Sequence, residues 1–143
     1  VNGTLSISMN HFTNLPDIEY VQDDFDVSHN RLEGKVNFPK HIGGFIDLFS
    51  NNITSLEGCP KKEKDEVNCD NNPIENLLQV LDRLRRIIKL SQIEILEKIE
   101  EFEIIKNINE VDLISMNSLF DYYDLVFDPS TVYEIPGYKL INN

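Results

Sequence analysis

The sequence predicts an α+β protein: a short repeat solenoid of about four coils with a parallel β strip, followed by a mainly helical capping region. Two observations carry this prediction. One apolar pattern containing an asparagine returns at a nearly constant interval before residue 74. From residue 74 onward, the apolar residues take the spacing of amphipathic helices. The predicted domains are therefore a solenoid over 1–73 and a helical interaction or capping region over 74–143.

The repeat units share the pattern apolar-x-apolar-x-x-Asn-x-apolar. They are residues 5–12 (LSISMNHF), 25–32 (FDVSHNRL), 46–53 (IDLFSNNI) and 67–74 (VNCDNNPI). Their asparagines are 20, 21 and 21 residues apart. Such a constant period is typical of a solenoid, in which each unit forms one coil and packs against the next.

The first two apolar positions of each unit predict two buried ladders. Alternate side chains of a strand point the same way, so residues two apart share one face. The expected inward pairs are Leu5/Ile7, Phe25/Val27, Ile46/Leu48 and Val67/Cys69. Stacking of these pairs from coil to coil would form the core of the solenoid.

The asparagine of each unit is predicted to be structural. These residues are Asn10, Asn30, Asn51 and Asn72. Their amides can bond backbone groups that are left unpaired where a strand ends, and identical amides can stack between coils. Because their spacing follows the repeat, we assign them to a structural ladder rather than to ligand contacts.

The repeat resembles the leucine-rich repeat, with a period at the short end of the 20–29 residues of that family. Leu15-Pro16, Phe38-Pro39 and Leu56 to Pro60 follow the units and are similar to the Leu-Pro turns of the short bacterial repeats. The stretch SNNITSLEGCP at 50–60 looks like degenerate repeat proteins of tailed bacteriophages. The resemblance covers about residues 1–77 and implies a protein-binding solenoid encoded by a phage.

Strand positions between the ladder residues predict an exposed acidic strip that carries two phenylalanines. The candidate partner-binding residues are Asp24, Asp26, Phe45, Asp47, Phe49, Glu66 and Asp70. Exposed aromatic rings surrounded by polar groups are typical of binding hot spots. We expect the rings to enter a pocket of a partner while the carboxylates select a basic surface.

Two alternative arrangements of the strip stay open. In the first, the rest of the chain covers the phenylalanines. In the second, the register of these degenerate repeats slips by one residue, which would turn the strip inward.

Patterns of metal and cofactor sites are missing from the sequence. The strip lacks the calcium-loop spacing, and His11, His29 and His41 lack the partners of a zinc site. Cys69 occupies a ladder position and Cys59 a turn, so we expect a packed cysteine and an ordinary surface thiol. We predict no metal and no cofactor.

Catalytic motifs are missing as well. The sequence has no Gly-rich phosphate loop, no Gly-x-Ser-x-Gly elbow and no His-Glu-x-x-His. Bacterial effectors with similar repeats can carry a ubiquitin-ligase domain with a catalytic cysteine, but no cysteine follows Cys69. A carboxylate pair among Asp121, Asp124 and Asp128 has no histidine or basic residue nearby. We predict no catalytic residue and no enzymatic activity.

The charge of the chain restricts its partners. It has 25 acidic and 13 basic side chains, a net charge of −12. This charge disfavours direct binding to nucleic acid and favours a protein partner with a basic surface. No apolar run approaches the roughly 18 residues of a membrane span, and no signal-peptide pattern is present. We therefore expect a cytoplasmic protein, in the host cytoplasm if a phage encodes it, and no pattern predicts its oligomeric state.

The second half of the sequence predicts helices. Asn72-Pro73 is a helix start, and Ser91 with Glu94 forms a capping box for a second helix, although one continuous helix is an alternative. The predicted elements are helices over 74–89, 91–105 and 110–125, a turn at 128–130 and, over 132–140, an irregular tail or two short strands.

We predict a non-enzymatic interaction module that binds or inhibits a host or viral protein through its concave acidic face. An alternative comes from residues 91–134, which hold eleven acidic side chains against Lys98 and Lys106. Such a run could imitate nucleic acid and block a DNA- or RNA-binding enzyme. A structural virion component is a third possibility. The helices could also serve only to cap the last coil.

Overall fold

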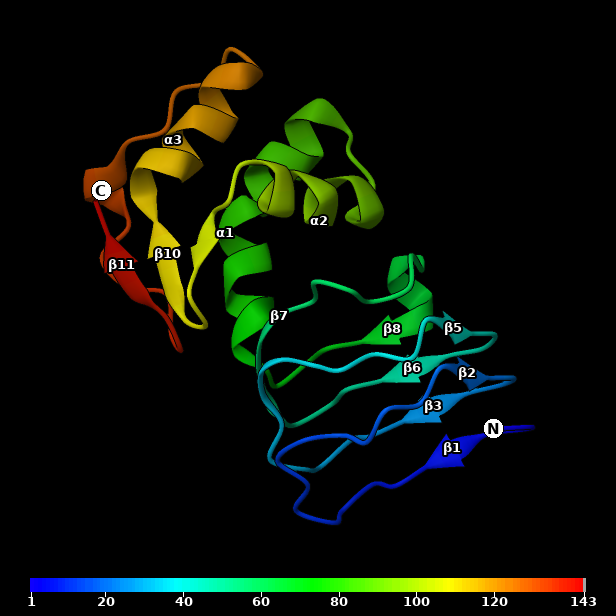
Figure 1. The fold of residues 1–143 in the computed structure, drawn as a ribbon. Helices are drawn as coiled ribbons and strands as arrows, with labels where there is room; N and C mark the ends of the chain where they lie inside the picture. The colour runs from blue at the N-terminus through cyan, green and yellow to red at the C-terminus, as the bar shows by residue number, and fades with distance from the viewer. Residues whose placement is uncertain (143) are drawn as a thin grey trace. The chain divides into compact units, whose positions relative to one another are not determined.

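The computed structural model describes residues 1–142, except for the side chain of Lys64. The chain divides into two compact units, Val1–Glu75 and the part from Asn76 onward. In Figure 1 the first unit runs from blue to green and the second from green to red.

The first unit is a parallel β-solenoid of about three turns, which confirms the solenoid prediction. Its main sheet has the order β1-β3-β6-β8, with one strand from each repeat unit (Figure 1). Leu5 pairs with Phe25, Phe25 with Ile46 and Ile46 with Val67, so equivalent positions of the repeat are in register. The strands are β1 (Leu5–Ser6), β3 (Phe25–Asp26), β6 (Ile46–Asp47) and β8 (Val67–Asn68).

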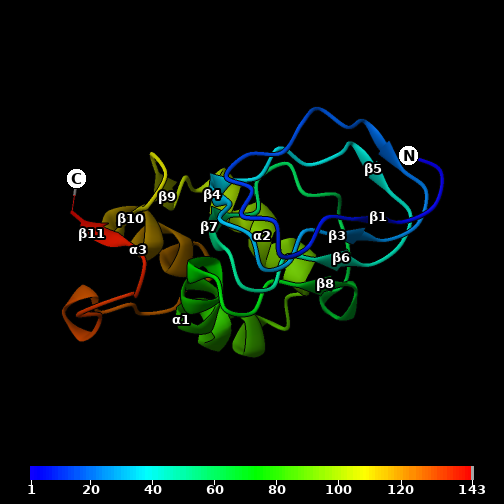
Figure 2. The same ribbon diagram turned by 90° about the horizontal axis from the view of Figure 1, so that it is seen from below.

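Two further pairs of parallel strands form other sides of the coils. They are β2 (Tyr20–Val21) with β5 (His41–Ile42), and β4 (Glu33–Lys35) with β7 (Asn52–Ser55). Figure 2 shows β4 and β7 on a different side of the coils from the main sheet. These strands were not predicted from the sequence, because a strand of two to four residues is too short to show a period of two by itself.

The core of the solenoid is made by the ladder residues of its inner coils. Phe25, Val27, Ile46 and Leu48 are at most 1 % exposed. Val67 and Cys69 are also buried, whereas Leu5 and Ile7 of the first coil are only half-buried. A 3-10 turn, Lys64–Glu66, precedes β8.

The second unit contains helices and a small mixed sheet. Helix α1 (Pro73–Ile88) begins at the unit boundary, and α2 (Gln92–Glu101) follows after Lys89, whose φ of 61° ends the first helix. The alternative of one continuous helix is therefore wrong. Ser91 caps α2, and its side chain and that of Glu94 form the predicted capping box. None of the helices within residues 1–142 has the length and apolarity to cross a membrane.

The helix predicted over 110–125 is shorter than expected. Glu110–Asp112 form β10, which lies between β9 (Ile105–Lys106, antiparallel) and β11 (Lys139–Ile141, parallel). Helix α3 therefore begins at Leu113, with Asp112 as its N-cap, and ends at Tyr122. Backbone pairing with a distant segment overrides the local helical pattern here.

The other two boundaries also differ from the prediction. Helix α2 ends at Glu101 rather than at 105, because Glu103 has a φ of 50° and leaves the helical conformation. The tail at 132–140 contributes the start of β11, and a 3-10 turn precedes it at Pro129–Thr131.

Candidate functional site

The chain turns sharply after each strand of the main sheet, and we call these turns the corners of the solenoid. The inner corners, which follow β3, β6 and β8, are each built around the side-chain amide of an asparagine. The Oδ1 atom of Asn30 accepts hydrogen bonds from the N–H groups of Asn10 and Phe12, both at 3.0 Å. Its Nδ2 donates to the carbonyl oxygens of Ile7 at 3.0 Å and Val27 at 2.9 Å. The amide therefore joins two successive coils through backbone groups.

The later corners repeat this arrangement. Asn51 Nδ2 donates to Val27 O at 3.1 Å, and Asn72 Nδ2 donates to Leu48 O at 2.8 Å. Asn51 Oδ1 accepts from Leu32 N at 3.1 Å, and Asn72 Oδ1 accepts from Ile53 N at 3.0 Å. The hydrogen bonds described for these side chains run to the backbone, not from one amide to the next. Through these contacts, Asn51 and Asn72 join successive coils as Asn30 does.

The residue before each asparagine adopts the left-handed conformation. The φ values are 61° for Met9, 53° for His29, 59° for Ser50 and 57° for Asn71. A left-handed residue turns the chain sharply at the end of the strand, at a cost of about 1–2 kcal/mol for an L-residue. The hydrogen bonds made by the side chain of the following asparagine hold this conformation in every coil. The strained position had no sequence signal, because the four residue types differ.

The seven candidate partner-binding residues come from three successive coils. Asp24, Phe45 and Asp70 are exposed, and Asp26, Asp47, Phe49 and Glu66 are half-buried. Asp26 pairs directly with Asp47 across neighbouring strands, so two like charges face each other. Like charges at paired positions repel, and this destabilises the pairing unless other contacts hold the two side chains.

The paired aspartates close a turn within their own coils. Asp26 Oδ1 accepts from Ser28 N at 3.0 Å and from Ser28 Oγ at 2.7 Å. Asp47 Oδ1 accepts from Phe49 N at 3.0 Å. Asn68 occupies the same position in the next coil and accepts from Asp70 N at 3.1 Å. Because an uncharged asparagine makes the same bond, the turn explains these positions without a partner.

Phe45 is the more exposed of the two phenylalanines, with 39 % of its surface accessible. Its N–H donates to Asp24 Oδ1 at 2.8 Å. The neighbouring Gly44 permits this approach, because a Cβ there would lie 2.2 Å from the same oxygen. Asp24 is therefore held beside the backbone of Phe45. Gly44 was not predicted as part of the site, and its only signal in the sequence is its place in a Gly-Gly pair.

Phe49 and Glu66 have contacts within the solenoid. The ring of Phe49 packs edge-on against His29, with a centroid distance of 5.2 Å and an interplanar angle of 67°. Glu66 Oε2 lies 3.9 Å from Lys62 Nζ. Lys62 also donates to Gly43 O at 3.3 Å, so it places a positive charge next to the acidic strip. Lys62 precedes the strand positions of its repeat, so the strand pattern did not predict it as a neighbour of the strip.

The cysteines are poor nucleophiles. Burial raises the pKa of the Cys59 thiol to about 12, despite the lowering influence of Lys62. Burial also raises the pKa of Cys69 to about 12, and the adjacent Glu75 carboxylate adds to the shift. The Cys69 Sγ donates to Glu75 Oε2 at 3.3 Å. Both thiols stay protonated at neutral pH, where a thiolate would be needed for reaction.

Among residues 1–142, the His, Cys, Asp and Glu side chains form no group of three or more that could hold a metal ion. The carboxylates of Asp24, Asp26 and Asp47 accept hydrogen bonds from backbone N–H groups.

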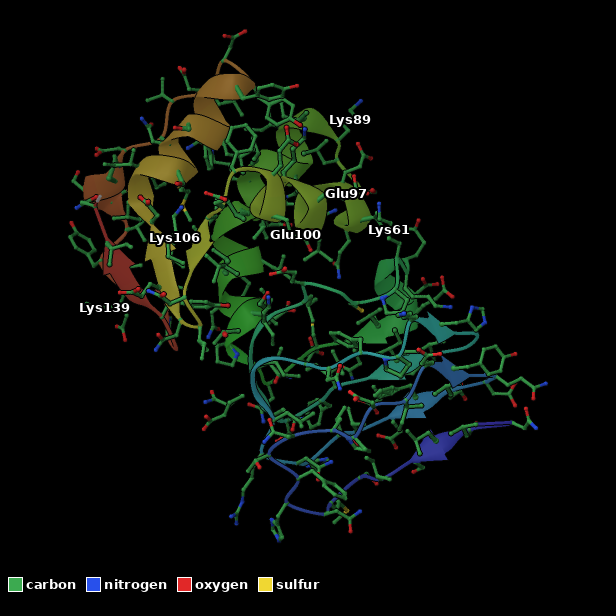
Figure 3. All side chains as sticks on the ribbon, in the orientation of Figure 1. Lys61, Lys89, Glu97, Glu100, Lys106 and Lys139 are labelled. Atoms are coloured by element: carbon green, nitrogen blue, oxygen red, sulfur yellow. The ribbon has the colours of Figure 1, made fainter. Side chains whose placement is uncertain are left out.

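Several acidic residues of the second unit have local partners. Lys98 Nζ lies 2.8 Å from Glu101, and Lys106 Nζ lies 3.2 Å from Glu103. In the strand register, the backbone of Glu110 lies opposite both Lys106 and Lys139, which Figure 3 labels on this unit. The acidic run is therefore partly neutralised by its own lysines.

Other acidic side chains of that run bind backbone at turns and helix starts. Glu94 completes the capping box, Asp112 caps α3, and Asp128 caps the 3-10 turn. Hydrogen bonds from Ser130 lower the pKa of Asp128. Asp121, Asp124 and Glu134 are exposed.

The basic cluster at 83–89 also has an acidic partner. Asp82 lies 2.8 Å from the guanidinium nitrogens of both Arg85 and Arg86. These pairs, three and four residues apart on one helix, neutralise part of the positive charge of the cluster.

The chain therefore consists of a parallel β-solenoid with acidic and aromatic side chains on its surface, followed by a unit of helices and a small mixed sheet. In comparisons with known proteins, no family model, no curated protein and no solved structure matches the chain.

Proposed function

We propose that the chain is a non-enzymatic interaction module that binds a protein with a basic surface. The proposed binding surface is the exposed acidic strip with its two phenylalanines, which we call the acidic face. The observation that carries this proposal is Phe45, an exposed ring whose backbone is held by the carboxylate of Asp24. Because this bond already orders the backbone at Phe45, less backbone ordering is needed on binding, which favours affinity.

We further propose that the solenoid is a four-coil leucine-rich repeat of the short bacterial or bacteriophage type. The repeat pattern at 5–74 and its Leu-Pro turns support this proposal. A phage origin would make the chain an accessory protein that acts in the host cytoplasm, binding or inhibiting a host or viral protein. The second unit would then cap the last coil or add a second surface.

Two physical effects would cooperate at the face. Burial of a phenylalanine ring in a partner pocket contributes about 1.5–3 kcal/mol. The carboxylates of Asp24 and Asp70 would attract a basic surface and raise the association rate, an effect that salt screens. Asp26 and Asp47 would add charge while they keep their turns closed.

The test is capture from cell extracts with three immobilised chains: wild type, Phe45→Ala, and Tyr133→Ala as control. Tyr133 is 90 % exposed and lies in the second unit, so its loss leaves the face intact. We expect a basic protein that wild type and control retain and that Phe45→Ala loses. Equal retention by Phe45→Ala, with an unchanged melting temperature, would show that the face is not the binding site.

A second proposed function is nucleic-acid mimicry by the acidic second unit. It is favoured by the absence of any lysine or arginine between Lys106 and Lys139, where six acidic residues lie. The local partners of Glu94, Asp112 and Asp128 weaken it, because those carboxylates already bind the chain. Mimicry predicts that duplex DNA displaces the captured protein and that Phe45→Ala does not. Incorporation of the chain into particles would favour a virion component instead.

A further inference from the structure

Three aromatic rings and a lysine meet where two helices of the second unit end. Phe102 is the C-cap of α2, and Tyr123 is the C-cap of α3, directly after Tyr122. The ring centroids of Phe102 and Tyr122 lie 5.6 Å apart at an interplanar angle of 69°, and those of Tyr122 and Tyr123 lie 4.9 Å apart at 89°. We call these three rings, together with Lys98 of α2, the aromatic cluster.

The aromatic cluster already holds a positive charge of its own chain. The Nζ atom of Lys98 lies 5.0 Å from the centroid of the Tyr122 ring, which is a cation–π distance. The same ammonium group donates to Oε2 of Glu101 at 2.8 Å, and this hydrogen bond is the main cause of the raised pKa of Lys98. A cation is thus held between an aromatic face and a carboxylate, which shows the ligand chemistry that the cluster accepts.

The surroundings of the cluster also favour a cation. The carbonyl groups at a helix C-terminus carry partial negative charge, and both α2 and α3 end at the cluster. Asp121 and Asp124 directly precede and follow the tyrosine pair, and both are exposed. No Lys or Arg lies between Lys106 and Lys139. The charge of this region is therefore complementary to a basic ligand.

Tyr122 keeps accessible ring surface for such a ligand. It is 60 % exposed, although its ring contacts those of Phe102 and Tyr123 as well as Lys98. Contacts with two neighbouring rings restrict the orientation of this side chain, so less order is lost when a ligand binds. A guanidinium group is planar and weakly hydrated, and it stacks on an aromatic face while its N–H groups bond a carboxylate. Arginine therefore fits the cluster better than lysine.

We propose that the aromatic cluster is a binding site for an arginine side chain of a partner protein. The guanidinium group stacks on the accessible ring surface of Tyr122 and donates to the carboxylate of Glu101. In the free chain Lys98 contacts this ring and this carboxylate, so Lys98 competes with the arginine and lowers its affinity. The site belongs to the second unit, and its test does not depend on the acidic face of the solenoid.

The test is an NMR titration of the full chain with N-acetyl-arginine methylamide, followed on the backbone amide signals of Glu101 and Phe102. N-acetyl-citrulline methylamide is the control ligand, because it has nearly the same shape without the charge. We expect saturable shifts with the arginine compound and binding at least about fivefold weaker for the citrulline compound. Tyr122→Leu should weaken arginine binding about two- to fivefold, whereas Tyr122→Phe should retain it, because the ring makes the contact.

A second pair of variants tests the competition by Lys98. Lys98→Gln frees the ring and the carboxylate, and we expect arginine binding to become about two- to fivefold tighter. Lys106→Gln is the matched control, because it removes the same charge from a lysine that also pairs with a glutamate three residues away. It should change the affinity clearly less than Lys98→Gln does.

Four results would overturn the proposal, with circular dichroism used to check that each variant is folded. The first is the absence of a saturable shift with the arginine compound, and the second is equal binding of the citrulline compound. The third is unchanged affinity of folded Tyr122→Leu. The fourth is an equal gain in affinity for Lys98→Gln and Lys106→Gln, which would indicate unspecific attraction to the acidic surface.

Discussion

The polar side chains that stabilise the two units act over different distances along the chain. In the solenoid, Asn30 bonds backbone groups 20 and 23 residues away, and Asn51 reaches 24 residues. In the second unit, Ser91 and Asp112 bond groups two or three residues away at the starts of helices. Loss of a solenoid amide therefore disturbs two coils at once, whereas loss of a cap disturbs one helix end.

The largest effect is expected for Asn30→Ala. This side chain is buried and bonds both its own and the preceding coil, so its removal leaves several buried backbone groups unpaired. We expect a loss of about 3–5 kcal/mol in the free energy of unfolding, measured by urea denaturation. Asn10→Ala is the control, because the side chain of Asn10 is exposed and bonds only its own coil. Equal losses would refute the difference between inner and outer corners.

The next effect concerns close approach between coils. A Cβ on Gly43 would lie 2.0 Å from the carbonyl oxygen of Gln22, which belongs to the neighbouring coil and is backbone. We expect Gly43→Ala to cost about 2–3 kcal/mol, since the coils must separate. Gly58→Ala meets no atom within 4 Å and bears only the strain of a φ of 84°. A melting temperature no lower for Gly43→Ala than for Gly58→Ala would argue against tight stacking.

A pH series tests burial in the solenoid. The thiols of Cys59 and Cys69 have pKa values raised from 9.0 to about 12 in the folded chain, so the unfolded state loses these protons first. Their contribution to stability is complete below pH 9 and is lost as the pH rises from 9 to 12. The variant with both cysteines changed to alanine should lose less stability over this range in urea denaturation. Parallel pH curves for the two chains would contradict the burial.

The smallest effect is expected in the second unit. Ser91→Ala removes the acceptor for the Glu94 N–H at 3.2 Å and so breaks the capping box of α2. A lost N-cap costs about 1 kcal/mol. Ser91→Asp should retain most of this stability, because aspartate is also a good N-cap. If Ser91→Ala lowers the free energy of unfolding as much as Asn30→Ala, a local helix cap and a bond between coils contribute equally to stability, which would contradict the comparison.

Sequence reasoning succeeded where one physical rule repeats. The 20- and 21-residue spacing requires equivalent positions to stack, and this predicted a parallel solenoid with Phe25, Ile46 and Val67 in register. It failed where pairing is distant and unrepeated. Residues 110–112 looked helical, but in the structure they pair with Lys139–Ile141. No local pattern reports such a partner.

The acidic face shows the same division. Composition identified its acidic and aromatic character, and that character follows directly from alternation along the strands. Alternation along a strand does not show which side chains already have hydrogen-bond or packing partners within the solenoid. Only the folded structure distinguishes Phe45, whose ring is exposed, from Phe49, which packs on His29.

By itself, the sequence determined the period, the inward ladders of the solenoid, the capping box at Ser91 and the excess of negative charge. These features depend on residues near in the chain or repeated along it. The tertiary structure decided the side strands of the coils, the sheet of the second unit, and the turn-closing role of Asp26 and Asp47. These depend on hydrogen bonds whose partners become neighbours only when the chain folds.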